Sequence, residues 1–419
     1  MATALTNTMN SILQIFSDPM AEIPDTSIGW PRLLSSTGTS WLLDFVFHAI
    51  ILITIFTIIG IGFVKWHNNV FQQDPPSATL MAGPSTPDAS MNADIMVNYQ
   101  VATATYGGIY TEQGRPHSNY SGRVDHLAVA AQITAGMRAL IFDVWPNPSA
   151  PTQPCVVAME QIQTPWYSPH FTSGVTESGY SNWKMLTRPT SEDLLSLMNE
   201  VAATAPVTDP FFVILNLHGA MTVPYLNIIG VILDTAFSGR HMPVEYAKAA
   251  APAFLCTAPV SVFVGNIFII ANIVVDPAFV TIANQTDVTN GAMTATKFAE
   301  QVNLLSVSGF PPGSATSPTQ NVYSVQSSAS ISSKTATCQG TTGPTATPFP
   351  SATFCVIQPS TGGLDTTNDT LYADSSFSTC LATGAQFVGI NVFDQATGSA
   401  TQSVFNATFS TSGLRKKGT

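Results

Sequence analysis

A long run of apolar residues near the N-terminus stands out from the rest of the chain. Residues 45–64 include one ionisable side chain, His48, and Trp41 and Trp66 flank the run. A helix of about 20 residues rises roughly 30 Å, the thickness of the hydrocarbon core of a bilayer. Tryptophan at both ends favours the membrane–water interface. The pattern therefore predicts a single transmembrane helix over residues 41–66.

After this segment, apolar residues come in short blocks of two kinds. Nearly continuous apolar runs are typical of strands buried on both faces, and spacing by three and four residues is typical of helices. Strands are predicted over 95–101, 137–145, 210–217 and 384–393, with a strand or strand pair over 260–270. Helices are predicted over 126–135, 191–203 and 225–237, the second with Ser191 at its N-terminus. Alternating strands and helices predict an α/β fold with a parallel sheet, open or closed into a barrel.

Changes in composition suggest segment boundaries. Ser, Thr, Pro and Gly dominate residues 306–380, which predicts an insertion or irregular β region. The predicted segments are a polar leader over 1–40, the transmembrane helix over 41–66, a Pro/Ser-rich linker or extended arm over 67–92, the first part of the folded domain over 93–305, the insertion over 306–380, and a final strand with the C-terminal tail over 381–419.

Low charge narrows the classes of function. Charged residues make up 9% of the chain, against roughly 25% in an ordinary soluble domain. A surface with so few charges is poorly protected against association, which favours a protein packed among neighbouring chains. The net charge is −11. The chain has 14 Lys and Arg residues, and the one run of consecutive basic residues among them is at 415–417. Nucleic-acid binding is therefore not expected.

The cysteines and the glycosylation sequons do not decide on which side of the membrane the large domain lies. The five cysteines form no Cys-x-x-Cys pair, so a zinc or redox motif has no support. They are compatible either with one disulfide in an oxidising compartment or with buried free thiols. Lys65 and His67 weakly favour a cytosolic large domain. Sequons favour the opposite side, at Asn119, Asn284, Asn368 and Asn406.

Three segments, in this order, carry a family resemblance. They are Gly-Met-Arg-Ala-Leu-Ile-Phe-Asp-Val-Trp over 136–145, Asp-Pro-Phe-Phe-Val-Ile-Leu-Asn-Leu-His over 209–218, and Gly-Ala-Gln-Phe-Val-Gly-Ile-Asn over 384–391. Together they resemble strands of the catalytic barrel of phosphoinositide-specific phospholipase C and its wider phosphodiesterase superfamily. The resemblance implies a distorted (β/α) barrel with its active site at the carboxyl ends of the strands.

The resemblance also implies a chemistry. Enzymes of this family cleave a phosphodiester with two histidines, and the calcium-dependent members hold the ion with an Asn and three carboxylates. The first histidine should follow the first strand in a His-Asn pair, where this chain is predicted to carry Tyr99-Gln100. His117 and His170 are the candidate catalytic residues if the protein is active.

The metal site that the resemblance implies has fewer carboxylates in this chain. Carboxylates should stand at Ile141, Asp143 and His218, and Asp143 is the one carboxylate among them. Asp143 is therefore the candidate metal ligand, with calcium as the cofactor only if the protein is active. Each residue also has a simpler interpretation. His117 and His170 would be loop histidines, His218 a hydrogen-bonded histidine at a strand end, and Asp143 a partner of Arg138 or of a backbone N–H.

These observations favour a membrane-anchored, catalytically inactive phospholipase-C-like protein without a cofactor. Its expected role is structural or scaffolding, in contact with the bilayer and with neighbouring chains of a large assembly. A minor capsid or membrane protein of a large virus is one such context. One alternative is an active phosphodiesterase that cleaves phospholipid or glycolipid headgroups. Another is a glycosylated surface protein that binds a ligand in the barrel mouth.

Overall fold

The structure is a computed structural model of the 419-residue chain. It describes residues 46–61, 89–111, 122–147, 150–161, 183–185, 193–218, 222–242, 258–273, 296–307, 322–325, 354–357, 377–382, 384–393, 400–410 and 412–417. The chain divides into two compact units, Met1–Gln73 and Asp74–Thr419, which are considered separately.

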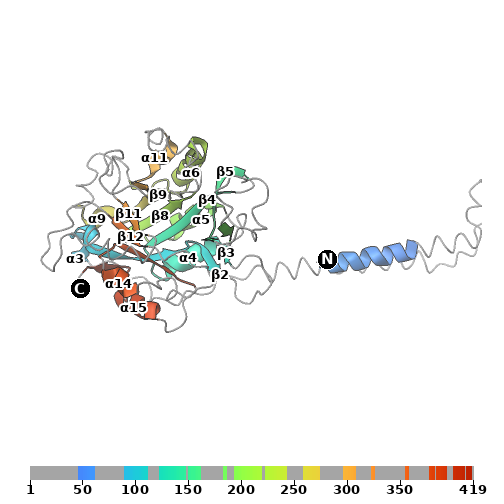
Figure 1. The fold of residues 1–419 in the computed structure, drawn as a ribbon, viewed down its shortest axis with the longest axis horizontal. Coiled ribbons are helices and arrows are strands. Elements are labelled where there is room, and N and C mark those ends of the chain that lie inside the picture. Colours follow the sequence, from blue (N-terminus) through green and yellow to red (C-terminus); the bar gives the residue numbers. More distant parts are fainter. Residues whose placement is uncertain are drawn as a thin grey trace, which may run out of the picture. The chain divides into compact units, whose positions relative to one another are not determined.

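The N-terminal unit contains one described helix, over residues 46–61 (Figure 1). The remaining residues of the predicted 41–66 segment lie outside the described ranges. Among the described residues, no helix combines the length and apolar character needed to cross a membrane. Exposed apolar side chains nevertheless surround this helix, and Ile53 and Phe56 are 66% and 69% exposed. The hydroxyl groups of Thr54 and Thr57 donate to backbone carbonyls four residues earlier.

The larger unit is built on a ten-stranded, mostly parallel sheet in the part of the chain that is described. Its main path runs β10-β9-β8-β4-β1-β13-β12-β11, while β5 and β14 pair antiparallel with β4 and β1 (Figure 1). The bounds are β1 Tyr99–Thr105, β4 Ala139–Asn147, β5 Ala150–Val156, β8 Phe211–Leu217, β9 Ile267–Ile273, β10 Leu304–Val307, β11 Val322–Val325, β12 Phe354–Ile357, β13 Phe387–Asn391 and β14 Leu414–Lys416. Two short hairpins flank it, β2 Ile109–Thr111 with β3 Gly122–Val124 and β6 Met159–Gln161 with β7 Trp183–Met185.

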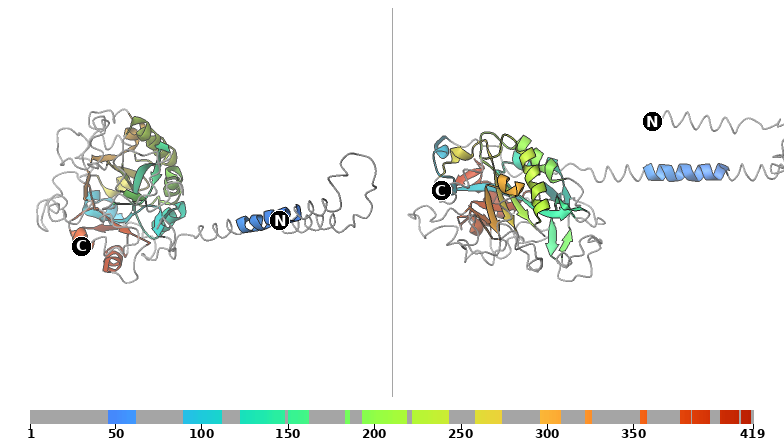
Figure 2. Two further views of the ribbon diagram at one scale, coloured as in Figure 1. Left: turned by 45° about the vertical axis from the view of Figure 1, so that its right-hand side comes forward. Right: turned by 90° about the horizontal axis from the view of Figure 1, so that it is seen from above.

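The sheet curls into a half-barrel (Figure 2). Phe212 of β8 and Phe387 of β13 pack with ring centroids 5.1 Å apart, although β4 and β1 lie between their strands in the sheet. Such a contact requires the sheet to bend around a shared interior. The end strands β10 and β11 also approach each other, but no ladder joins them in the described ranges. The fold is thus mixed α/β with a curled parallel sheet.

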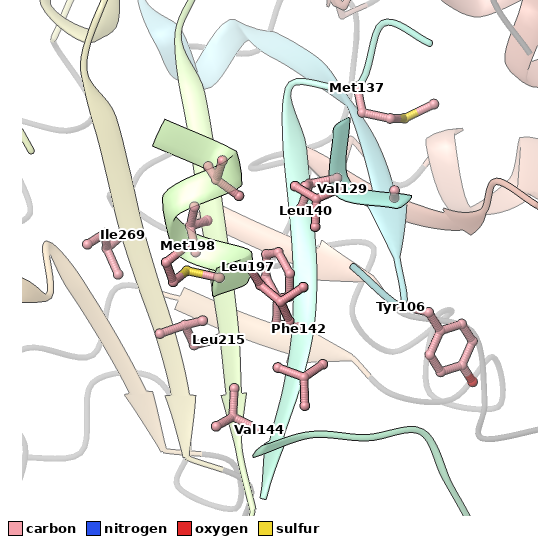
Figure 3. Close-up of a cluster of buried hydrophobic side chains, with 14 of the residues drawn as sticks. Tyr106, Val129, Met137, Leu140, Phe142, Val144, Leu197, Met198, Leu215 and Ile269 are labelled. Atoms are coloured by element: carbon pink, nitrogen blue, oxygen red, sulfur yellow. The ribbon is translucent and has the colours of Figure 1, made fainter. Parts of the chain in front are cut away.

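Helices cover the convex face. Their bounds are α4 His126–Thr134, α5 Leu194–Thr204, α6 Val223–Ala236, α11 Lys297–Gln301, α14 Phe377–Ala382 and α15 Ala400–Thr408. Figure 3 shows Phe142 of β4 and Leu215 of β8 beside Leu197 and Met198 of α5. These four side chains are completely buried. The convex core therefore holds the helices against alternate residues of each strand.

The concave face has its own core. Ala139 and Ile141 of β4 lie there with Phe212 and Ile214 of β8 and matching residues of the other strands. Three short elements bring further apolar residues to the amino ends of the strands: the 3-10 turn η1 Met96–Asn98, α9 Val260–Phe263 and β14. A preceding short helix, α3 Ala89–Asn92, contacts α9. The amino end of the half-barrel is therefore filled with apolar side chains.

Most of the predicted elements are confirmed, with three local corrections. The first strand begins four residues later than predicted, because 96–98 form the 3-10 turn and β1 spans Tyr99–Thr105. The second helix is capped by Asp193, which accepts a hydrogen bond from Ser196 N, rather than by Ser191. The predicted strand over 260–270 starts as the helical turn α9 and becomes β9 at Ile267.

The range predicted as a Ser/Thr/Pro-rich insertion contains strands of the main sheet. β11 and β12 pair in parallel over 322–325 and 354–357, and β12 pairs with β13. Of the cysteines, Cys155 and Cys380 are buried, and Cys155 is a free thiol. Burial raises the pKa of the Cys155 thiol to about 12, so this side chain stays protonated at neutral pH.

Asp94 is expected to stabilise the folded protein by an amount that decreases at acidic pH. Burial alone would raise its pKa, but Lys416 at 2.6 Å and hydrogen bonds from Ile95 N, Asn98 and Tyr99 lower it from 3.8 to about 2. The folded state therefore favours the carboxylate, and this contribution is full above about pH 4 and is lost as the pH falls toward 2. Because Lys416 is half-exposed, we expect Asp94→Asn to cost about 1 kcal/mol or less at pH 7.

Urea unfolding of the wild type and of Asp94→Asn at pH 7 and near pH 2 measures this effect. The difference in free energy of unfolding should shrink toward zero at the lower pH. A difference that is equally large at both pH values would contradict the assignment.

Candidate functional site: a polar layer at the carboxyl ends of the strands

The concave interior changes from apolar to polar toward the carboxyl ends of the strands. Asp143 of β4, Asn216 of β8 and Asn272 of β9 are register partners on adjacent strands. Each lies two residues beyond an isoleucine of the concave core, so all three share that face. Thr105 of β1 and Asn391 of β13 are paired in the same way on the other side of the curl. We call these five residues the carboxyl-end polar layer.

Asp143 is held by a chain of side-chain hydrogen bonds. Asn272 Nδ2 donates to Asn216 Oδ1 at 3.4 Å, and Asn216 Nδ2 donates to Asp143 Oδ1 at 2.9 Å. His218 Nε2 lies 3.2 Å from the same Asp143 oxygen. A carboxylate only accepts hydrogen bonds, so the proton of this hydrogen bond is on Nε2, and in that tautomer Nδ1 is the acceptor nitrogen. Asn216 and Asn272 are each 1% exposed, and the side chains of Asp143 and His218 are 19% and 14% exposed.

His218 is fixed from a second direction by Trp145. The two rings stack with centroids 4.2 Å apart and an interplanar angle of 2°. His218 N also donates to Val144 O, which ties the end of β8 to β4. The interpretation of His218 as a hydrogen-bonded histidine at a strand end is confirmed.

The alternative that paired Asp143 with Arg138 is wrong. Arg138 Nε contacts Asp209 Oδ2 at 2.5 Å, and both side chains are almost fully buried. Arg138 directly precedes β4, whereas Asp143 is the fifth of the nine residues of that strand, and the two side chains have different partners. Asp143 finds its partners across the strands instead.

The residues around Asp143 do not fit a calcium ion. Calcium takes six to eight oxygen ligands, most often from several carboxylates. Here Asp143 supplies one carboxylate, Ile141 lies in the apolar layer beneath it, and Asn216 and His218 direct N–H groups at its Oδ1. No cluster of three or more His, Cys, Asp or Glu side chains suited to a metal occurs in the described ranges. The role of Asp143 as a metal ligand stays a prediction.

The expected His-Asn pair should directly follow β1, and this chain has Tyr106 and Gly107 at that position. Because β1 ends at Thr105, Tyr99 and Gln100 lie at its amino end, and Tyr106 with Gly107 occupies the carboxyl end instead. Tyr106 has a φ of 54°, an uncommon value for a residue other than glycine. Gln132 holds the turn, because its Nε2 donates to Tyr106 O and its Oε1 accepts from Gly108 N. The candidate catalytic residues His117 and His170 lie outside the described residues.

Asn216, Asn272 and Asn391 were not predicted as site residues. Each is the polar residue near the end of a strand that is otherwise apolar, as in Phe-Phe-Val-Ile-Leu-Asn-Leu for β8 and Ile-Phe-Ile-Ile-Ala-Asn-Ile for β9. Aligning β8 and β9 by their carboxyl ends would have placed Asn216 and Asn272 in one layer, since parallel strands end at the same edge.

Comparison with known proteins gives structural matches alone. No family model matches the chain, and a search of curated proteins finds no match. The solved structures that match include PLC21 of L. pealei, at 12% identity and a TM-score of 0.41, and PLC21 of S. officinalis, at 12% identity and a TM-score of 0.44. Each match covers 72% of this chain and 34% of the other, so this chain spans about a third of the length of those proteins.

A bacterial protein is similar over nearly its whole length. It is the calcium-dependent phosphoinositol-specific phospholipase C of Pseudomonas sp., at 12% identity and a TM-score of 0.39. The match covers 80% of this chain and 99% of that protein. The structures that this half-barrel resembles are thus phosphoinositide-specific phospholipases C, at low sequence identity.

Proposed function

We propose that this chain is a membrane-anchored protein whose phospholipase-C-like distorted (β/α) barrel serves a structural or scaffolding role and does not cleave phosphodiesters. Its setting would be a large membrane-associated assembly, in contact with the bilayer and with neighbouring chains. A virion remains one predicted setting.

The observation that carries this proposal is the bonding of Asp143. Where the family resemblance implies a cation held by three carboxylates, this chain has one carboxylate, and Asn216 and His218 engage its Oδ1. Displacing these donors to admit a cation would break a hydrogen-bond network that also includes the buried Asn272. The polar layer therefore favours a role in holding strand ends together over a role in calcium-dependent chemistry.

The N-terminal helix supports the anchoring part of the proposal. A predominantly apolar helix with exposed side chains around its circumference is unfavourable in water and favourable in lipid. The threonine hydroxyls satisfy their hydrogen bonds within the helix, as a lipid environment demands. Extraction of the full chain from expressing cells tests this, since an anchored protein requires detergent and resists release by high salt or carbonate. Release by carbonate would contradict the anchor.

The experiment that tests the lack of catalysis is a hydrolysis assay on phosphatidylinositol vesicles with and without calcium. We expect turnover by the full chain at the background rate in both conditions. The alternative, an active phosphodiesterase, predicts turnover that His117→Ala and His170→Ala each reduce. Turnover that both substitutions abolish would overturn the proposal.

The scaffolding role is tested by association. Size-exclusion chromatography with light scattering on the full chain, solubilised from its native membrane, should find it in particles larger than the 419-residue monomer with its micelle. A monodisperse monomer would contradict a role in an assembly.

The alternative of a glycosylated surface protein gives a prediction at Asn406. This residue lies within helix α15, and Thr408 of its sequon is buried with its hydroxyl donated to Val404 O. Glycan acceptors lie in exposed loops, so we expect no glycan at Asn406 even when the chain is expressed in a secretory compartment. Mass spectrometry of the peptide after glycosidase treatment measures this, and Asn119, outside the described residues, serves as the comparison sequon. A glycosylated Asn406 would contradict the placement of α15.

A further inference from the structure

The polar layer presents hydrogen-bond acceptors at its exposed edge. Asn216 and His218 both engage Oδ1 of Asp143, and no hydrogen bond to Oδ2 or to His218 Nδ1 is found within the described ranges. Both side chains keep part of their surface in solvent. Behind them, Asn272 Oδ1 is a buried carbonyl oxygen without a partner in the same ranges. Asp143 Oδ2 and His218 Nδ1 are therefore the two polar atoms of these partly exposed side chains that the cluster itself does not use.

Asp143 is the acidic side chain of the cluster. The other members are the amides of Asn216 and Asn272 and the imidazole of His218, which directs Nε2 at the carboxylate. Arg138, which directly precedes the same strand, is paired with Asp209 and not with Asp143. An anion such as phosphate would meet like charge and two acceptors, whereas a cation with several N–H groups would find matching acceptors.

We propose that the edge formed by Asp143 and His218 is a binding site for an organic cation bearing several N–H donors, of the guanidinium or alkylammonium class. The cation would donate to Asp143 Oδ2 and to His218 Nδ1. Trp145 keeps the imidazole plane fixed, and Asn216 and Asn272 keep the carboxylate in place. The inference goes beyond the proposed function, because it needs neither the membrane anchor nor an assembly.

The site is expected to bind a guanidinium and to exclude a hard metal cation and phosphate. A hard cation needs the carboxylate free of N–H donors, while a guanidinium leaves the bonds from Asn216 and His218 to Oδ1 undisturbed. Phosphate needs donors, and the accessible edge of the cluster offers acceptors. A guanidinium is therefore expected to bind at these residues, whereas a hard metal cation and phosphate are not.

The test is an NMR titration of the full chain in detergent, labelled with ¹³C at histidine Cε1. His218→Gln assigns the His218 signal by its disappearance. We expect methylguanidinium to shift that signal saturably at constant ionic strength, while inorganic phosphate and calcium leave it unmoved. Asp143→Asn should weaken the apparent affinity by about tenfold or more, since it removes a charge-assisted hydrogen bond.

Asp234→Asn is the matched control. It removes the same charge from an exposed position on α6 and should leave the affinity unchanged. An unmoved His218 signal in the wild type would overturn the inference whether or not the variants fold. So would a shift caused by phosphate or calcium and not by methylguanidinium, or equal weakening by Asp143→Asn and Asp234→Asn.

Discussion

Replacing Arg138 by methionine is expected to lower the free energy of unfolding by about 3–5 kcal/mol, the largest single effect that we predict. Arg138 is 1% exposed, and its guanidinium contacts Asp209 Oδ2 and donates to Met137 O. Its removal leaves the Asp209 carboxylate buried without a cation. A charge left in this position must stay desolvated or take up a proton, and either outcome costs folding free energy. Urea unfolding followed by circular dichroism measures the loss.

Two further variants separate charge from packing. The double variant Arg138→Met/Asp209→Leu should recover much of the loss, because replacing both partners of a buried ion pair by apolar residues is often nearly neutral. Arg123→Met is the matched control, since Arg123 lies near Asp125 at a partly exposed position and should cost about 1 kcal/mol or less. If the double variant were as unstable as the single one, the buried carboxylate would not be the cause.

Gly230→Ala is expected to destabilise the protein by about 1–3 kcal/mol, although alanine is the better helix former by about 1 kcal/mol. Gly230 lies in the interior of α6, against α11. A Cβ atom there would stand 2.3 Å from Phe298 N and 2.4 Å from Lys297 C, which are backbone atoms that no side-chain rotation can move away. The two helices would have to separate.

Gly60→Ala gives the matched control for this substitution. Gly60 also lies in a helix, and nothing stands within 4 Å of the position that its Cβ would take. We expect a melting temperature equal to or above that of the wild type for Gly60→Ala and a lowered one for Gly230→Ala. An unchanged or raised melting temperature for Gly230→Ala would contradict the close approach of α6 and α11.

The sequence was sufficient to predict the strands that are buried on both faces. β4, β8 and β13 are nearly continuous apolar runs, because helices pack on their convex side and a second apolar core fills their concave side. The first strand was misplaced because residues 95–98 are as apolar as a strand while forming a 3-10 turn that fills the amino end of the half-barrel. Apolar character reports burial and does not by itself distinguish the two conformations.

The candidate site was predicted in part. Asp143 was located from the apolar run that it directly follows, and it lies near the end of the stretch of β4 that pairs in parallel with β8, over residues 139–144. Its partners could not be predicted from local sequence, since Asn216 and Asn272 are 73 and 129 residues away along the chain and meet it only through strand register. The order β9-β8-β4 is set by tertiary packing, and the hydrogen-bond chain to His218 follows from that order.

An experimental structure of the full chain, determined with millimolar calcium present, would show whether Asp143 binds the ion. We predict that Asp143 remains hydrogen-bonded to Asn216 and His218, with His218 stacked on Trp145 and no ion on the carboxylate. A calcium ion coordinated by Asp143, with Asn216 and His218 turned away from it, would contradict that prediction.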